Sequence, residues 1–234
     1  MEPLLFIKAE RSETFGVGPA AVADAGAEVV VWNAIEGEPP PSLDGVAGAV
    51  LFGSSFNVEH ADEQPFIHEL SRVTAAALDR GVPYLGICFG AQVLAWTLGS
   101  AVRKADEREI GYVPVHPLPA AADDPLLSAV ADGERVFQWH MDTFDLPAGA
   151  ELLAKGDGVV NQAYRVGDAA WATQFHFEID VPEIEMWTEE LADSLESEWD
   201  TTPEQLRVDA ARHRERHEAL GRDLFGRFVA VCRR

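Results

Sequence analysis

The sequence has little positive charge. Its 234 residues include 18 lysines and arginines against 40 aspartates and glutamates, which gives a formal net charge of −22 at pH 7. So acidic a surface repels phosphate backbones, and this argues against a nucleic-acid-binding protein. A high-salt cytoplasm would also suit such a surface, but the simpler interpretation is that the charge keeps the protein soluble.

Cysteine and long apolar runs are also scarce. Cys88 and Cys232 are the two cysteines, too few for a disulfide framework, so a reducing cytoplasm is the expected compartment. No apolar run approaches membrane-spanning length, and no His/Cys cluster has the spacing of zinc ligands. Residues 1–8 form an apolar strand candidate without the basic start or cleavage site of a signal peptide. We therefore expect a cytoplasmic protein with no metal, no cofactor and no membrane partner.

Apolar runs and helical patterns alternate along the first hundred residues. Strands are expected at 4–9, 28–34, 49–52 and 84–87, and helices within 15–25, 62–80 and 91–98. Such alternation of apolar strands with helices predicts an α/β fold with a doubly wound, mostly parallel sheet. In folds of this kind, sites lie at the carboxyl ends of the strands.

The pattern changes after the third expected helix. Shorter strands joined by turns are expected at 111–116, 135–140, 151–155, 162–166 and 170–176, which suggests an antiparallel extension of the sheet. From residue 182 the chain is charged and helical, and Thr201-Thr202-Pro203-Glu204 is a good start for a long last helix. We expect one domain over 1–234, with 182–234 as a helical C-terminal extension.

One stretch has the form of a nucleophile elbow. Cys88 lies between Gly86 and Gly90, directly after the expected strand 84–87 and before a helix. The glycines let strand and helix approach closely, and the free N–H groups and dipole of the helix favour a thiolate. A buried structural cysteine is the alternative, and the elbow alone leaves the two interpretations about even.

Two further stretches favour the catalytic interpretation. His176 and Glu178 follow an aromatic strand and lie on one side of it if the strand continues, so they supply a base and a group that orients it. The apolar run 48–52 breaks into a turn of small residues, Gly53 and Ser54, which can direct backbone N–H groups at a developing oxyanion.

These motifs resemble those of the class I (triad) glutamine amidotransferases, especially stand-alone members similar to the glutaminase domain of GMP synthase. Gly86-Ile87-Cys88-Phe89-Gly90-Ala91-Gln92 looks like the nucleophile motif of the family, and Gln174-Phe175-His176-Phe177-Glu178 looks like its Gln-Phe-His-Pro-Glu motif. Trp139-His140-Met141-Asp142-Thr143-Phe144 looks like the segment that closes over glutamine. The resemblance covers roughly residues 1–180, and three motifs in this order are far more specific than any one alone.

The resemblance implies a flavodoxin-like fold and a role for each matching residue. The catalytic residues would be Cys88, His176 and Glu178, and the oxyanion hole would use backbone N–H groups of Phe89 and Ser54. Residues implied to bind substrate are Gly53, Gln92, His140, Met141 and Asp142. Two positions depart from the family: Phe177 replaces a proline, and Ser54 replaces a glycine, which matters if that position demands positive φ.

The implied activity is an amidohydrolase that attacks the glutamine side-chain amide through Cys88, forms a γ-glutamyl thioester, and releases ammonia and then glutamate. The sequence contains no nucleotide-binding motif, so either a separate synthetase accepts the ammonia or the enzyme hydrolyses a small γ-glutamyl amide for its own sake. A non-catalytic regulatory subunit with the same fold is a third alternative, although the complete set of Cys88, His176 and Glu178 argues against it.

Overall fold

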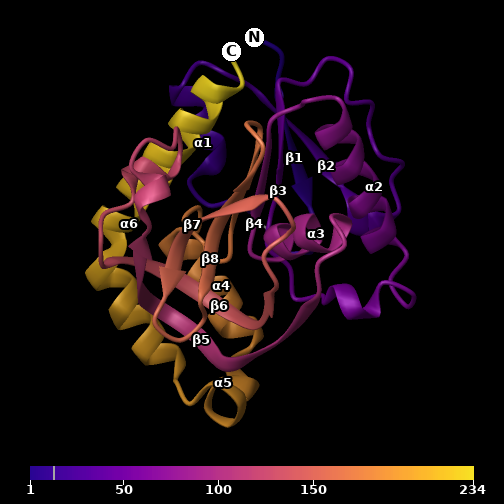
Figure 1. Ribbon diagram of the computed structural model, residues 1–234. Coiled ribbons are helices and arrows are strands. Elements are labelled where there is room, and N and C mark those ends of the chain that lie inside the picture. The colour runs from indigo at the N-terminus through magenta and orange to yellow at the C-terminus, as the bar shows by residue number, and fades with distance from the viewer. Residues whose placement is uncertain (13) are drawn as a thin grey trace.

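A single mixed sheet forms the centre of the protein. The computed structural model describes residues 1–12 and 14–234, and within them the sheet has nine strands in the order β2-β1-β3-β4-β9-β8-β7-β5-β6 (Figure 1). Strands β2, β1, β3, β4 and β9 pair in parallel, and the pairings from β9 outward to β6 are antiparallel. The α/β fold with an antiparallel extension is thus confirmed.

The parallel half consists of short, apolar strands. They are β1 (Leu4–Lys8), β2 (Val29–Asn33), β3 (Gly48–Leu51), β4 (Tyr84–Ile87) and β9 (Ala170–Thr173). β1, β3, β4 and β9 are almost wholly buried, as expected for strands covered on both faces. The order 2-1-3-4 followed by a fifth parallel strand is that of flavodoxin-like folds.

The antiparallel half has longer strands: β5 (Val102–Pro117), β6 (Glu134–Phe144), β7 (Ala150–Gly156) and β8 (Asn161–Val166). β5 begins well before the expected residue 111. Its first part, 103–108, is charged and mostly exposed, and its register with β6 shifts between Lys104 and Glu109. That part therefore carries no alternating apolar pattern by which a sequence identifies a strand.

Helices cover both faces of the parallel half. α1 (Gly18–Asp24) and α6 (Pro203–Val231) share one core cluster with β1, β3 and β4, while α2 (Phe66–Asp79) and α3 (Phe89–Thr97) share a second with the other face. α4 (Val181–Glu190) and α5 (Ala192–Trp199) precede α6. Short 3-10 turns occupy Ala34–Glu36, Val58–His60, Pro119–Ala121 and Leu127–Ala129. No helix among the described residues has the length and apolar character needed to cross a membrane.

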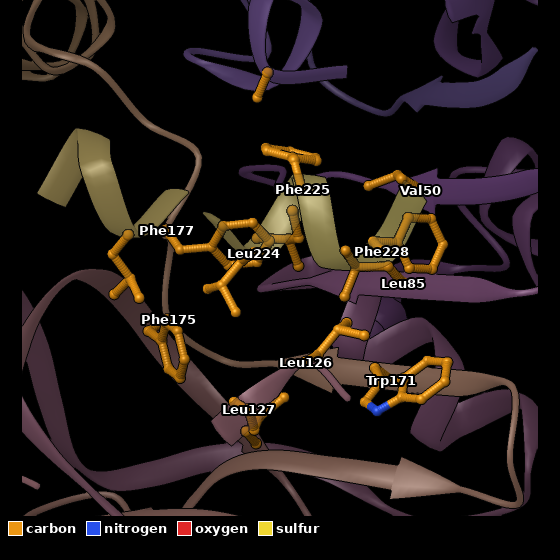
Figure 2. Close-up of a cluster of buried hydrophobic side chains, with 14 of the residues drawn as sticks. Val50, Leu85, Leu126, Leu127, Trp171, Phe175, Phe177, Leu224, Phe225 and Phe228 are labelled. Atoms are coloured by element: carbon orange, nitrogen blue, oxygen red, sulfur yellow. The ribbon is translucent and has the colours of Figure 1, made fainter. Parts of the chain in front are cut away.

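The long helix α6 packs the C-terminal part of the chain against the central sheet. Thr202 caps it through a reciprocal capping box with Gln205, as its sequence predicts. α6 runs along one side of the molecule and returns the C-terminus to the neighbourhood of the N-terminus (Figure 1). Figure 2 shows Leu224, Phe225 and Phe228 of α6 inserted among side chains of the sheet and of the segment after β9.

Candidate active site

Cys88 lies in a strained turn between β4 and α3. Its backbone has φ 50° and ψ −105°, a conformation uncommon for a residue other than glycine. A Cβ on Gly86 would lie 2.5 Å from the carbonyl oxygen of Gly90, and a Cβ on Gly90 would lie 2.1 Å from that of Leu51. Only glycines allow this approach of strand and helix. The predicted elbow is therefore present, with Cys88 buried at its apex.

His176 joins Cys88 to Glu178. The His176 ring interacts electrostatically with the Cys88 sulfur, and its Nδ1 lies 2.6 Å from Oε1 of Glu178. All three side chains are buried. Burial alone would lower the pKa of His176, but the Glu178 carboxylate and the Cys88 sulfur outweigh it and raise that pKa well above its usual value. The arrangement favours a proton on His176.

The second cysteine has no such surroundings. The Cys232 sulfur packs against Gly48, where an added Cβ would lie only 2.5 Å from it. Burial raises the pKa of the Cys232 thiol to about 12, so that it stays protonated and unreactive near neutral pH. Cys232 is therefore a packing residue.

The strand that was expected to carry His176 is shorter than predicted. β9 ends at Thr173, and His176 makes only an isolated bridge, its N–H donating to the carbonyl oxygen of Phe137 at 2.9 Å. The His176–Glu178 contact arises in the loop instead. Phe177, at the position of the family's proline, is buried with its ring 5.3 Å from that of Phe225 on α6. The substitution therefore leaves both functional groups in place and anchors the loop to α6.

The turn after β3 lies beside the ring of His176. A Cβ on Gly53 would lie 2.7 Å from Cε1 of His176, which explains a glycine at this position. Ser54 has no positive φ, so the expected strain from a missing glycine is absent. Its hydroxyl donates to the carbonyl oxygen of Ala9 at 2.8 Å and accepts the N–H of Phe56 at 3.1 Å. Serine thus fixes the turn rather than distorting it.

Gln92 connects the backbone of Asp142 with Gln174, which contacts the sulfur. The Gln92 side-chain amide donates to Gln174 at 3.3 Å, with the backbone oxygen of Asp142 at 3.5 Å. Gln174 in turn donates to the sulfur of Cys88 at 3.6 Å. A donor at that position stabilises a thiolate. Gln174 was not among the predicted site residues, although it stands within the His176 motif.

His140 supports the site from behind. Its Nδ1 lies 3.1 Å from the backbone oxygen of Asp142, and its Nε2 lies 3.1 Å from Glu109. Buried Glu109 also accepts from the side chain of Gln162 and the N–H of Val159. Burial opposes the Glu109 charge, yet these donors together lower its pKa. His140 therefore positions the 140–142 segment, and Glu109 holds His140, a contact across β5 and β6 that no spacing in the sequence indicates.

A cavity of about 290 Å³ opens above the sulfur. Its lining includes every predicted site residue except Phe89 and Glu178, namely Gly53, Ser54, Cys88, Gln92, His140, Met141, Asp142 and His176. Phe89 adjoins Cys88 at the start of α3, and Glu178 lies behind His176. The rest of the lining comes from α4, α5, β6 and the loop at Glu10, and it includes Trp187, Trp199 and Trp139. No group of acidic, His or Cys side chains able to hold a metal ion occurs in the described part of the chain.

The site can perform nucleophilic chemistry on a carbonyl group. A buried thiol, a histidine held by a carboxylate and a helix amino end meet at one cavity, which satisfies the geometric requirements for acyl transfer. The N–H groups of Phe89 and of the 53–54 turn make no hydrogen bond within the described residues, and these are the donors that an oxyanion would need.

Comparisons with known proteins agree with this geometry. Residues 20–186 match the family model "Glutamine amidotransferase class-I". A GMP synthase (glutamine-hydrolyzing) from Porphyromonas gingivalis is 39% identical over 154 residues, covering 65% of this chain and 28% of that protein. The putative glutamine amidotransferase-like protein YfeJ from Salmonella typhimurium is 28% identical over 186 residues, covering 77% of each chain.

Solved structures give the same answer for the fold. The crystal structure of a glutamine amidotransferase from Thermotoga maritima superposes with a TM-score of 0.89 at 28% identity, covering 97% of this chain and 98% of that one. The chain spans little more than a quarter of the GMP synthases it matches, but nearly the whole of this structural relative. The family match extends over most of the sequence and includes Cys88 and His176. This chain belongs to the glutamine amidotransferase class-I family.

Proposed function

We propose that the protein is a cysteine-dependent amidohydrolase that releases ammonia from the side-chain amide of glutamine. The observation that carries the proposal is the buried Cys88–His176–Glu178 set at the floor of an open cavity. A fold kept only for regulation would have no use for an uncommon backbone conformation at Cys88. The glutamine hydrolysis named for the related GMP synthases supports the same activity.

In the first half of the reaction the Cys88 sulfur attacks the amide carbon of glutamine. The thiol proton has moved to His176, whose raised pKa keeps it there. The negative charge that develops on the carbonyl oxygen is held by the N–H groups of Phe89 and Ser54. His176 then gives its proton to the amide nitrogen, the C–N bond breaks, and ammonia leaves a γ-glutamyl thioester on Cys88.

In the second half a water molecule replaces ammonia. His176, now neutral, takes a proton from the water while the water oxygen attacks the thioester carbon. The same oxyanion donors stabilise the second tetrahedral intermediate. The carbon–sulfur bond breaks, glutamate leaves, and Cys88 and His176 return to their starting state. Glu178 fixes the orientation of the ring in both halves.

The 140–142 segment and Gln92 would bind the glutamyl part of the substrate. The Asp142 carboxylate is fixed by Asn57 at 2.5 Å and by Lys104 at 3.0 Å, and the Gln92 amide is fixed by Gln174. The acceptor of the ammonia would be a separate synthetase, by analogy with GMP synthases, of which this chain matches only one part.

The test is glutamate and ammonia release from glutamine by the wild type and Cys88→Ser. The serine variant should retain the circular dichroism spectrum and lose turnover, since a hydroxyl is a far weaker nucleophile. A glutamine-mimicking alkylating agent should label Cys88 and spare Cys232. Cys232→Ser is the matched control and should keep both activity and labelling. Turnover in the Cys88→Ser variant, or equal labelling of both cysteines, would overturn the assignment.

A further inference from the structure

The cavity continues past the catalytic residues into a wall made of tryptophans. Trp139 on β6 lies between two other indoles, with ring centroids 6.1 Å from Trp187 and 6.2 Å from Trp199, both nearly edge-to-face. All three are only partly buried and line the cavity. The Trp187 ring also lies 5.3 Å from that of His176. Indole surfaces that face a cavity in this way bind alkyl chains and cations.

Acidic side chains stand beside this wall. Glu190 and Glu198, at the ends of α4 and α5, line the cavity, and neither carboxylate has a hydrogen-bonding or ion-pair partner among the described residues. Arg108 donates to the backbone oxygen of Glu198, which ties α5 to β5. No lysine or arginine occurs among the described residues of the lining. The wall therefore attracts positive charge and repels negative charge.

The position of the wall relative to His176 indicates which part of a substrate reaches it. Under the proposed mechanism, His176 protonates the leaving nitrogen, so a substituent on that nitrogen lies on the His176 side of the cleaved bond. Trp187 packs against His176 on that side. The Gln92 amide and the 142 carbonyl, which would hold the glutamyl part, lie together in the lining of the same cavity. Glutamine, whose leaving group is ammonia, has nothing to place against the tryptophans.

We propose that this cavity accepts γ-glutamyl amides whose amide nitrogen bears an alkyl chain ending in a positive charge, such as γ-glutamyl derivatives of diamines. The inference rests on the proposed function and deepens it. The chemistry is unchanged: Cys88 forms the thioester, the C–N bond breaks, His176 protonates the nitrogen, and the free diamine leaves in place of ammonia. Water then releases glutamate. Trp139, Trp187 and Trp199 bind the chain, and Glu190 and Glu198 bind its terminal ammonium group.

The experiment compares two substrates that differ only at the end of the chain. Glutamate release is measured with γ-glutamyl-4-aminobutylamide, with γ-glutamyl-pentylamide, in which a methyl group replaces the ammonium, and with glutamine. We expect kcat/KM for the charged amide to exceed that for the neutral one by about tenfold or more, the factor that a cation on an indole and two carboxylates supports.

Variants then locate the effect. The double variant Glu190→Gln, Glu198→Gln should bring the ratio of charged to neutral substrate close to one. The matched double control is Glu189→Gln, Glu196→Gln, which removes the same charge from the same two helices at exposed positions outside the cavity lining. It should leave the ratio unchanged.

The outcomes separate this inference from the proposed function. Hydrolysis of glutamine with no preference for the charged amide, or an equal fall of the ratio in both double variants, would overturn the inference and leave the glutaminase intact. Absence of glutamate from all three substrates, together with absence of labelling at Cys88, would overturn the proposed function as well.

Discussion

Gly90→Ala should disable the site by adding one methyl group. The new Cβ would lie 2.1 Å from the carbonyl oxygen of Leu51, 2.9 Å from its carbonyl carbon and 3.2 Å from its Cβ. The first two are backbone atoms of β3, so no side-chain rotation relieves the contact. Real Cβ contacts stay above about 3 Å, and α3 must therefore move away from β3 by about 1 Å.

That displacement has a cost in stability and a cost in rate. Overpacking of a tight core costs about 1–3 kcal/mol, which corresponds to a fall of roughly 0.3–1 M in the urea midpoint for a chain of this size. Cys88 and the N–H of Phe89 move with the start of α3, and a misplacement of about 1 Å costs about 10²-fold in turnover. Urea unfolding followed by circular dichroism, and glutamate release from glutamine, measure the two effects.

Gly226→Ala is the matched control. Gly226 lies inside α6 with nothing within 4 Å of the added Cβ, so the same substitution should stabilise the protein by about 0.5–1 kcal/mol through helix propensity and leave turnover unchanged. If Gly90→Ala unfolded at the wild-type urea concentration and turned over normally, the close approach of α3 to β3 would not be what positions Cys88, and the reasoning would fail.

Three other substitutions test single contacts. Ser54→Gly should not raise the glutaminase rate, because Ser54 has no positive φ to relieve, and should cost about 1–2 kcal/mol in urea unfolding through two lost hydrogen bonds and added loop entropy; a severalfold faster variant would contradict this. Glu178→Gln should remove the main cause of the raised His176 pKa. The stabilisation that comes from a raised histidine pKa is complete below the ordinary value of about 6.5 and is lost as the pH rises through the value in the folded state. The unfolding free energy that the variant lacks relative to the wild type should therefore become smaller as the pH rises above 6.5. A difference that stays constant with pH would show that the pair does not couple to folding. Glu109→Gln turns an amide nitrogen toward donors and should destabilise the protein by about 1–3 kcal/mol, raising KM for glutamine more than it lowers kcat through the displaced His140; an unchanged KM would mean that His140 does not position the 140–142 segment.

Short-range rules were sufficient for the elbow at Cys88. The elbow can be recognised from the spacing of Gly86, Cys88 and Gly90, because the approach of strand and helix is a local property of the chain. The strand 84–87 was predicted with its observed bounds. The pairing of His176 with Glu178 was also predicted, although by an argument that assumed a longer strand than β9 proves to be.

What the sequence could not indicate depends on contacts between distant segments. The first part of β5 is stabilised by pairing with β6 rather than by an apolar face, so its charged sequence shows no strand pattern. Glu109 meets His140 only across that pairing. Trp187 and Trp199 reach the cavity because α4 and α5 fold back over Trp139. A helical pattern predicts the helices but not the direction in which they return.

The packing of α6 against the loop that carries His176 and Glu178 has a consequence for biosynthesis. Gly221 of α6 lies so close to the loop that a Cβ there would be 2.3 Å from the carbonyl oxygen of Phe177, and a Cβ on Gly16 would be 2.0 Å from that of Glu178. The ribosome completes α6 after every other element described here. A nascent chain thus contains the Cys88 thiol well before the loop that carries His176 is held in place, and under the proposed function hydrolysis should begin only when α6 docks on that loop.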